Sequence, residues 1–591
     1  MEQIQKKEAF NPDEDLWVHD TSVDHKGRLP LRASTGAWKA SFFIISIEFS
    51  ERLSYFGIAT SLIIYLTKVI HQDLKTAAKS VNYWSGVTTI MPLLGGFVAD
   101  GYLGRFPAVL VSSVIYFLGL LLLTMSRIIP SWRPCGSGIC HKPRKVHEVV
   151  FFLAIYLISV GTGGHKPSLE SFGADQFDDD HPEERRKKLS FFNWWNCGLC
   201  SGLIVAVTLI VYIQDNVSWG VADIILTCIM AFTIIIFCAG RPFYRFRLPM
   251  GSPLTPMLRV LVAAFAKRKL PHASSTAELY ELPNSTKSRS RLLFHTENFK
   301  FLDKAAIIEH KETAVESQIN AWRLATVSEV EEMKLILKMI PIWLTSLPFG
   351  ICVAQTSTFF VKQSATMNRN ITDNFVIPPA SVFGLSAIGM IISVAIYDKL
   401  LVPLLRRATG NERGIDILQR IGIGMIITFT TMVIAGLVER KRLNLVHSDP
   451  IKGSLSMSVF WLAPQFVIIG MGDGFSLVGL QEYFYDQVPD SMRSLGIGLY
   501  LSVLGVSSFL SSFLITIVDK ITEKTGTSWF GKDLNSSRLD YFYWLLAVIV
   551  AVNIVPYMVV ARKYSYKNVQ QRADVAAVAD SFKGDGLEAI A

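Results

Sequence analysis

Long apolar segments, separated by shorter polar ones, run along most of this chain. Six of them precede a polar stretch that begins near residue 240, and six more follow it. A helix of about 20 mostly apolar residues spans a lipid bilayer. The pattern therefore predicts an all-α membrane protein with 12 transmembrane helices in two six-helix bundles. The segments lie near residues 38–66, 80–101, 107–126, 149–172, 189–213, 217–239, 335–359, 380–402, 416–438, 457–480, 492–517 and 540–561.

The polar stretches divide the chain into five predicted parts. These are an N-terminal tail (1–35), a first bundle (36–240), a linker (241–331), a second bundle (332–562) and a C-terminal tail (563–591). The first tail contains Pro12, Gly27 and Pro30, which favours a flexible segment. The linker is rich in basic, serine and threonine residues. We expect it to be solvated, with an amphipathic piece near residues 304–318.

The charges beside the apolar segments indicate an orientation. An even number of helices places both tails and the linker on one side of the membrane. Arg241, Arg245 and Arg247 directly follow the sixth segment, and basic residues favour cytoplasmic loops. We therefore expect the tails and the linker to be cytoplasmic. Three N-x-S/T sequons then fall on the outer side, at Asn216, Asn370 and Asn535.

Composition agrees with a membrane protein and excludes several other classes. Half of the 591 residues are apolar and only 18% are charged, whereas soluble proteins average about 25% charged residues. The net charge is +9, but no basic stripe interleaves with aromatic residues as nucleic-acid binders require. We expect the excess to lie near anionic lipid. The lipid bilayer is thus the predicted partner, with no nucleic acid, and the chain is predicted to be a monomer or a weak dimer.

The sequence offers little support for an enzyme. It contains no metal-binding cluster, no phosphate-binding glycine loop and no Ser/His/Asp set on one predicted face. We therefore expect no catalytic residues, no bound metal and no cofactor. Seven cysteines are too few for a disulfide scaffold. Cys135 and Cys140 flank a Gly-Ser-Gly turn and could form a disulfide if that loop faces an oxidising compartment. Cys197 and Cys200 lie in an apolar segment, which favours packing over a metal or redox role.

The first apolar segment contains an unusual charged group, Glu48-Phe-Ser-Glu51-Arg52. Residues three and four apart share one face of a helix, so the three side chains lie together. Such charges at membrane depth are costly unless they pair or face water, and they usually mark a proton or substrate path. A soluble helix with a local salt bridge is the alternative, and the other apolar segments disfavour it. The group predicts a proton-coupled carrier.

A second motif lies between the second and third segments, at Gly96-x-x-x-Asp100-x-x-x-Gly104-Arg105. Glycine permits a tight turn and a close helix contact. Asp100 and Arg105 can pair at a helix end and hold one state of a gate. The spacing of these residues, and their position between the second and third segments, resemble those of the signature loop of the major facilitator superfamily. The two halves of such transporters rock around a central site. The resemblance implies that fold here.

Further motifs indicate a particular family within this superfamily, and the resemblance to it covers about residues 20–565. Together they resemble the proton-dependent oligopeptide transporter family, whose plant branch is the nitrate transporter 1/peptide transporter family. They are Gly161-Thr-Gly163-Gly164-His-Lys166-Pro167, Phe172-Gly-Ala-Asp175-Gln176-Phe177-Asp178, Phe191-Phe192-Asn193-Trp194-Trp195, Ile377-Pro378-Pro379-Ala380-Ser381, Tyr397-Asp398, Leu418-Gln419-Arg420-Ile421-Gly422 and Tyr483-Phe-Tyr-Asp486-Gln487.

The resemblance implies roles for several residues. Glu48, Glu51 and Arg52 complete the family's E-x-x-E-R motif, which is implicated in proton coupling. Lys166 matches the central-cavity lysine, and Asp473 occupies the position of its acidic partner on the tenth helix. The two would form a pair that joins the halves. Lys166 could instead snorkel to the membrane surface, which its position after three glycines disfavours.

Two positions depart from the substrate motifs of the family. Ala59 stands where bacterial peptide carriers place an arginine, and Val353 stands where a nitrate-coordinating histidine would precede Gln355 by two residues. Tyr55 and Gln355 remain candidates for lining the substrate cavity.

The function predicted is a proton-coupled symporter that moves a small nitrogenous solute, nitrate and/or di/tripeptides, by alternating access, with nitrate slightly favoured. The alternatives are a non-transporting membrane sensor on the same fold and a carrier of another plant metabolite. The expected location is the plasma membrane or the vacuolar membrane.

Overall fold

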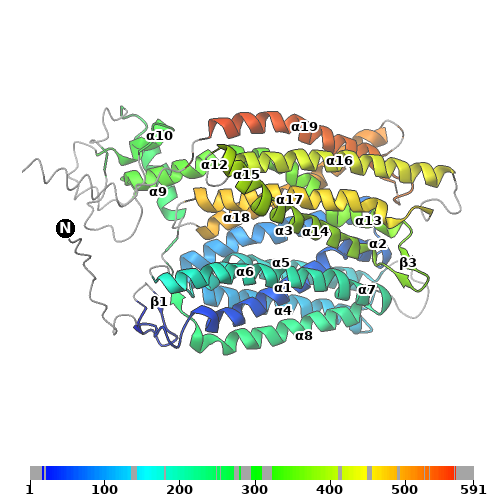
Figure 1. Cartoon of the computed structure of the whole chain (residues 1–591), viewed down its shortest axis with the longest axis horizontal. Coiled ribbons are helices and arrows are strands. Elements are labelled where there is room, and N and C mark those ends of the chain that lie inside the picture. Colours follow the sequence, from blue (N-terminus) through cyan, green and yellow to red (C-terminus); the bar gives the residue numbers. More distant parts are fainter. Residues whose placement is uncertain are drawn as a thin grey trace, which may run out of the picture.

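The computed structural model describes most of the chain between residues 16 and 566. The described residues are 16–18, 22–134, 143–178, 181–247, 249, 251–252, 254–271, 279–280, 295–308, 322–409, 415–448, 456–488, 493–524, 526, 528–531, 533–564 and 566. Cys135 and Cys140 lie outside them, so the predicted disulfide is not described. Long helices dominate this part of the chain, and they run side by side along the longest axis of the molecule (Figure 1).

Six helical rods form the first half. The first rod is α1 (Ala37–Ala59) with α2 (Leu62–Lys68), and the second is α3 (Leu74–Val98) with the π-helical turn η2 (Ala99–Leu103). The third and fourth are α4 (Arg105–Ile128) and α5 (Lys145–Ala174). The fifth joins α6 (Pro182–Val205), η3 (Ala206–Ile210) and α7 (Val211–Asn216), and the sixth is α8 (Trp219–Ala239).

Six further rods form the second half. They are α12 (Val327–Val353) with η7 (Thr356–Phe360) and α13 (Val361–Ala365); η8 (Pro379–Phe383) with α14 (Gly384–Ile396), η9 (Tyr397–Leu401) and α15 (Val402–Thr409); α16 (Ile417–Ser448); η11 (Val459–Leu462) with α17 (Ala463–Gln487); α18 (Arg493–Lys524); and α19 (Leu539–Lys563). Two short strands, β3 (Asn370–Thr372) and β4 (Phe375–Val376), form an antiparallel hairpin between the first two of these rods.

Hydropathy and helix positions agree with the predicted membrane fold. Ten of the described helices are long and apolar enough to cross a membrane. The first and second rods complete the set and are more polar, since α1 contains Lys39, Glu48, Glu51 and Arg52 and α3 contains Lys75, Lys79 and Asn82. The prediction of an all-α membrane protein with two groups of six helices is therefore confirmed.

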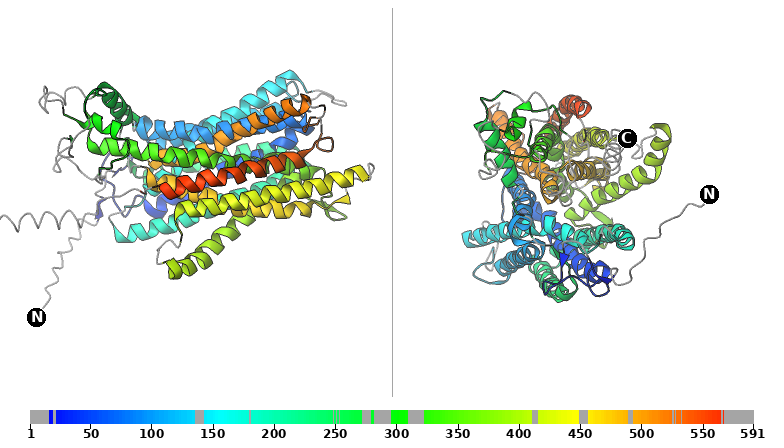
Figure 2. Two further views of the ribbon diagram at one scale, coloured as in Figure 1. Left: turned by 90° about the horizontal axis from the view of Figure 1, so that it is seen from above. Right: turned by 90° about the vertical axis from the view of Figure 1, so that its left-hand side faces the viewer.

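The two halves pack side by side and meet along α3 and α18 (Figures 1 and 2). Within each half, glycines let two helices cross at backbone contact, as membrane helices commonly do. A Cβ atom on Gly95 of α3 would lie 2.2 Å from the carbonyl oxygen of Gly163 on α5. A Cβ atom on Gly470 of α17 would lie 1.9 Å from the carbonyl oxygen of Ser386 on α14. The second and fourth rods of each half are thus joined in the same way.

One end of the bundle, called here the linker side, carries the N-terminal segment and the linker (left in Figure 1). Strand β1 (Ser22–Val23) pairs with β2 (Phe246–Arg247), which follows the sixth rod. Arg32 lies 2.9 Å from Asp178 and 2.8 Å from Glu184, and fully buried Arg245 lies 2.7 Å from Glu184. The prediction of a flexible tail is therefore wrong for residues 22–35, because these ion pairs and strand contacts attach them to the first half.

The described parts of the linker also pack against the bundle. Helix α9 (Leu254–Ala266), α10 (Lys300–Asp303) and the turn η6 (Lys304–Ala306) share an apolar core with the start of α12. Lys334 on α12 is fully buried and lies 2.7 Å from Asp303 and 2.8 Å from Glu331. The prediction of a solvated linker is wrong for these residues. The amphipathic helix is α9, and residues 309–321 of the predicted piece lie outside the described residues.

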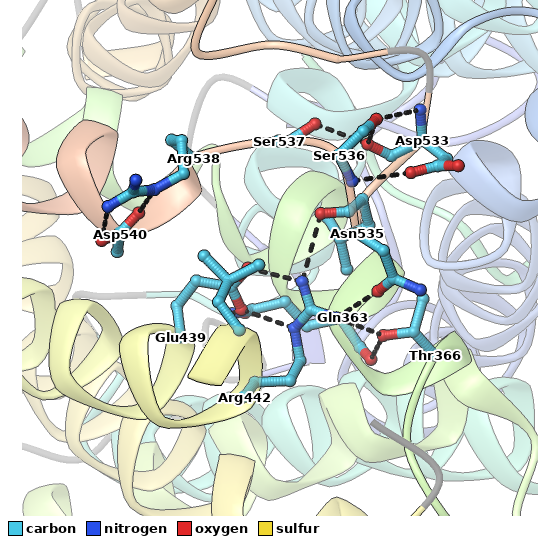
Figure 3. Close-up of polar contacts among 12 residues, drawn as sticks. Gln363, Thr366, Glu439, Arg442, Asp533, Asn535, Ser536, Ser537, Arg538 and Asp540 are labelled. Carbon is cyan, nitrogen blue, oxygen red and sulfur yellow. Dashed lines mark hydrogen bonds and ion pairs between the residues drawn. The ribbon is translucent and has the colours of Figure 1, made fainter. Parts of the chain in front are cut away.

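The opposite end, called here the hairpin side, contains a buried polar network in the second half (Figure 3). Glu439 and Arg442 on α16 are fully buried and 2.7 Å apart. Gln363 on α13 donates to Glu439 at 2.6 Å, and Arg442 donates to the side-chain oxygen of Asn535 at 2.6 Å. The network therefore ties α13 and α16 to the loop before α19. The three sequon asparagines, including Asn535, all lie on this side.

Substitution of Arg442 tests the contribution of this network to stability. Arg442→Met should lower the free energy of unfolding by about 3–5 kcal/mol, because it leaves the Glu439 carboxylate buried without a cation. The double variant Glu439→Gln/Arg442→Met should recover part of that loss. Exposed Arg440, on the same helix, provides the control Arg440→Met. Thermal unfolding of the purified protein in detergent measures all three variants, and equal melting temperatures for Arg442→Met and Arg440→Met would contradict the assignment.

Candidate functional site

Six charged or titratable side chains gather in the middle of the first half and are called here the central charged cluster. They come from two helices, with Glu48, Glu51 and Arg52 on α1 and His165, Lys166 and Glu170 on α5. The cluster combines the predicted E-x-x-E-R residues and the predicted lysine with two residues that the sequence interpretation missed.

The α1 part of the cluster has the geometry that its spacing predicts. The Arg52 Nε atom lies 2.6 Å from Glu48 Oε1 and 3.5 Å from Glu51 Oε2. Both glutamates are fully buried, whereas 16% of the Arg52 side chain is exposed. A single guanidinium therefore serves two buried carboxylates. Glu51 accepts no hydrogen bond at either oxygen, so its charge is stabilised only through nearby cations.

A close contact with α6 holds this part of α1 in place. A Cβ atom on Gly202 would lie 2.9 Å from both Arg52 Cβ and the carbonyl oxygen of Phe49. Only a residue without a side chain allows α6 to approach α1 this closely. The glycine therefore covers the backbone of α1 beside the ion pair and helps to exclude lipid from it.

Lys166 lies against an aromatic pair. Its Nζ atom is 4.2 Å from the centre of the Tyr55 ring, at a distance typical of a cation–π contact. Tyr55 in turn stacks on Trp84 of α3, with 5.8 Å between ring centres. Lys166 is 7% exposed, and its nearest charges are Arg52, Glu51 and Glu48. Its position inside the bundle disfavours the snorkelling alternative.

Asp473 lies on α17, in the second half, and is separate from Lys166 in this conformation. Its Oδ1 atom is buried and has no hydrogen-bond partner. The contacts described for Lys166 are those with α1, so the predicted pair across the halves is not formed here. A pair that forms in another conformation of the carrier stays a prediction.

Gln355 belongs to a polar contact between the halves. It donates to Ser511 Oγ on α18 at 3.1 Å, and Asn82 on α3 donates to the same oxygen at 3.1 Å. Gln355 is fully buried, so it does not line an open space in this conformation. Its predicted role in the substrate cavity is thus untested.

Further contacts join the two halves on the hairpin side. Lys75 at the start of α3 lies 3.0 Å from Asp519 near the end of α18. Lys362 on α13 donates to Thr67 Oγ1 at 2.9 Å. Arg369 lies 3.5 Å from Asp215. These contacts close the hairpin side of the bundle in the structure described.

The predicted gate loop lies at the linker side of the first half. Gly96 is buried at the end of α3, and Gly104 has φ +81°, a value that favours glycine. Arg105 Nε lies 3.3 Å from Asp100 Oδ1, so the predicted ion pair forms. Arg105 also binds Asp175 at the end of α5. The role of this loop as a gate stays a prediction.

The second half contains a comparable arginine, which the sequence interpretation did not single out. Arg420 lies in the first turn of α16, as Arg105 does in α4, and is 3.4 Å from Glu482 near the end of α17. Its guanidinium stacks 4.1 Å from the centre of the Tyr397 ring. Two motifs of the sequence resemblance, containing Tyr397 and Arg420, therefore meet at one end of the second half, and the third begins at Tyr483, directly after Glu482.

His165 and Glu170 are the members of the central cluster that sequence reasoning missed. His165 is fully buried, and both of its ring nitrogens lack a hydrogen-bond partner. Glu170 follows Lys166 by one helical turn and is near Glu48 and Arg52. The spacing of four residues between Lys166 and Glu170 could have indicated Glu170 from the sequence, because it places both side chains on one face of the helix.

Cys197 and Cys200 are free thiols in the structure.

Comparisons with known proteins agree with this architecture. The model of the POT family, PTR2, matches residues 106–531. Protein NRT1/PTR FAMILY 5.7 of Arabidopsis thaliana is 60% identical over 580 residues, covering 98% of this chain and 96% of that protein. Protein NRT1/PTR FAMILY 5.6 of the same plant is 61% identical over 559 residues, covering 94% and 96%.

Solved structures share the fold. The crystal structure of an auto-inhibited POT family peptide transporter has a TM-score of 0.65 and 18% identity, covering 90% of this chain and 98% of that one. The in meso crystal structure of the POT family transporter PepTSo has a TM-score of 0.64 and 17% identity, covering 89% and 99%. The predicted family resemblance is confirmed: this chain belongs to the POT family, a family of membrane transporters rather than enzymes.

Proposed function

We propose that this transporter is a proton-coupled symporter that moves a small nitrogenous solute, nitrate and/or di/tripeptides, by alternating access. The observation that carries the proposal is the charge imbalance on α1. Two fully buried carboxylates, Glu48 and Glu51, share the single guanidinium of Arg52. A buried charge without a partner costs several kcal/mol, so one added proton would stabilise the site.

The position of Arg52 can link proton binding to conformation. In the structure Arg52 lies closer to Glu48 than to Glu51, and both Glu51 oxygens lack hydrogen bonds. A proton on Glu51 would weaken its attraction for Arg52. Because a guanidinium of this kind is partly exposed, it could then turn towards a substrate or another acid. Binding of substrate and proton would become mutually dependent in this way.

The contacts between the halves support an alternating-access cycle. Lys75–Asp519, Lys362–Thr67 and Arg369–Asp215 close the hairpin side. We propose that the linker side is cytoplasmic, as the basic residues after the sixth rod predict. The structure would then represent a conformation closed to the outside. Movement of the halves would break these polar contacts and open a path on the hairpin side.

The charges of the candidate site bear on the substrate. Glu48, Glu51, Glu170 and Asp473 provide four acids, whereas Arg52 and Lys166 provide two basic groups. Nitrate would have Lys166 as its main cationic contact, since Val353 replaces the histidine of the family motif. Glu170 makes the site more acidic than the sequence interpretation assumed. The expected substrate preference therefore shifts from nitrate to a small zwitterion, because its amine can pair with one of these acids.

A non-transporting sensor on the same fold is the second candidate, and a carrier of another plant metabolite is the third. The intact Glu48, Glu51 and Arg52 set favours transport over sensing, because a sensor needs no proton path. A carrier of another metabolite would use the same proton site with a different cavity. Uptake assays with a panel of solutes distinguish these three functions.

Glu51→Gln tests the proton site. The variant removes a proton-binding group with little change of shape, so uptake driven by an inward proton gradient should fall at least tenfold. The amount of protein at the membrane should remain near wild type. Glu297 is 86% exposed on the linker, and Glu297→Gln is the matched control. Uptake in oocytes at pH 5.5 and 7.5 measures the effect. A normal pH dependence in Glu51→Gln would contradict the assignment.

A double-mutant cycle tests the predicted pair between the halves. Lys166→Ala and Asp473→Ala should each impair transport, and their effects should be non-additive by about 0.5–3 kcal/mol, as for residues that interact. Because the two residues are apart in the structure described, the coupling would arise in another conformation. Uptake rates of the single and double variants give the coupling energy. Strictly additive losses would show that the two residues do not meet during the cycle.

Substrate competition tests the charge argument. Nitrate should bind weakly, with a Kd of about 1 mM or higher. A Kd of about 1 mM corresponds to a binding free energy of about −4 kcal/mol. Dipeptides should compete at least as well as nitrate, and selectivity among them should be broad. Uptake of labelled nitrate and labelled dialanine, each with the other as competitor, measures this order. A sub-micromolar KM for nitrate would overturn the argument.

A further inference from the structure

The imidazole of His165 occupies an unusual position in the first half. It is fully buried on α5, and neither ring nitrogen has a hydrogen-bond partner. Buried polar groups in folded proteins are nearly always hydrogen-bonded, so each exception calls for an explanation. An unpartnered buried donor or acceptor costs about 1–3 kcal/mol. The fold therefore maintains this side chain at a cost.

His165 lies beside the two glutamates of the E-x-x-E-R group. Glu48, Glu51 and His165 each offer one side-chain oxygen or nitrogen, and these three atoms lie within 4.8 Å of one another. A proton can move between groups at this distance after a small side-chain rotation. The imidazole thus has two carboxylates as its nearest acid–base neighbours and no competing hydrogen bond.

The other groups around His165 are limited. From α1 the charges are Glu48, Glu51 and Arg52, and from α5 the neighbouring charge is Lys166. On α4, Tyr116 contributes a phenol whose oxygen lies 3.5 Å from the carbonyl oxygen of Glu51. From α3, uncharged Met91 and Gly95 pack against this part of α5. Two acids and two cations therefore determine the electrostatic environment of the imidazole.

A second buried histidine on the same helix shows the ordinary arrangement. His147 is also fully buried, but its Nε2 atom lies 2.9 Å from the Tyr65 hydroxyl. Its Nδ1 atom lies 3.2 Å from the carbonyl oxygen of Ser126 and 3.0 Å from that of Trp132. His147 therefore has a structural role. The contrast indicates that burial alone does not explain the unpartnered ring of His165.

We propose that His165 is a third proton-holding group, which exchanges the transported proton with Glu51. The inference rests on the proposed proton coupling and deepens it. In the exchange the O–H bond of the Glu51 carboxylic acid breaks and an N–H bond forms on the imidazole. A neutral acid and a neutral imidazole become a carboxylate and an imidazolium, so the total charge is unchanged.

The two positions of the proton have different effects on Arg52. With the proton on His165, both Glu48 and Glu51 are ionised and two carboxylates hold the guanidinium. With the proton on Glu51, only Glu48 attracts Arg52 fully. Transfer between the two groups would thus decide how firmly α1 holds its arginine. His165 would allow the carrier to keep its proton without releasing Arg52.

The direct test observes the imidazole in the full-length protein. Protein labelled with ¹⁵N-histidine is placed in lipid nanodiscs, and the His165 signal is identified as the one lost in His165→Gln. We expect this signal to change from neutral to protonated imidazole between pH 8 and pH 5, and Glu51→Gln to shift its midpoint by about one pH unit. A His165 ring that stays neutral throughout, or a midpoint unaffected by Glu51→Gln, would overturn the proposal. If His165→Gln does not fold, His165→Asn identifies the signal.

Transport assays separate this inference from the proposed function. With labelled dialanine and labelled nitrate as probes, His165→Gln should reduce acid-driven uptake at least fivefold while retaining exchange at equal pH on both sides. His147→Gln is the control, and it should lower the melting temperature without changing the pH profile. Parallel loss of uptake and exchange, or an unchanged pH profile, in His165→Gln would contradict the role of His165. A wild-type protein without acid-driven uptake would instead contradict the proposed proton coupling.

Discussion

The ion cluster of Glu48, Glu51 and Arg52 is the constraint on which the centre of the first half depends. Two carboxylates and one guanidinium lie inside an apolar bundle, where an uncompensated charge is costly. Contacts from neighbouring helices lower this energetic cost. Gly202 brings α6 against the backbone beside Arg52, and Lys166 supplies a second cation from α5. Three acids and two cations leave the cluster one positive charge short when Glu170 is included, and the proposed proton site rests on this deficit.

The same glycines that make the bundle compact also bring the functional side chains together. Gly163 and Gly164 immediately precede His165 and Lys166, and a Cβ atom on Gly163 would lie 2.8 Å from Met91 Cβ on α3. Small residues here let α5 approach its neighbours until the charged side chains of α5 and α1 share one space. Residues 163–166 of α5 therefore determine both how closely the helices pack and where the charged side chains lie. A larger residue would separate the helices and move the imidazole and the ammonium away from the carboxylates.

The sequence predicted the helices well because a membrane helix is defined by length and apolar content, which a single sequence contains. It also placed Arg52 beside Glu48 and Glu51, because that contact follows from helical spacing. It did not predict the docking of residues 22–35, since the pairs of Arg32 with Asp178 and Glu184 join residues more than 140 positions apart. The polar composition of residues 22–35, taken alone, is typical of a solvated segment. His165 was overlooked for a related reason: its burial and its missing partners are properties of the packed bundle.

Hydropathy predicted two groups of six helices, but not the side-chain contacts that the two halves have in common. Arg105 in the first turn of α4 binds Asp175 at the end of α5, and Arg420 in the first turn of α16 contacts Glu482 near the end of α17. The third and fourth rods of each half are thus joined on the linker side by an arginine and an acid. On the hairpin side the Glu439–Arg442 network holds the second half together, and further contacts there run between the halves. The contacts described between the halves at Lys75–Asp519 and Arg369–Asp215 thus lie at the hairpin side, whereas the arginine–acid contacts of the linker side lie within each half. In the proposed transport cycle, movement of the halves would break the contacts between them and keep the contacts within each half.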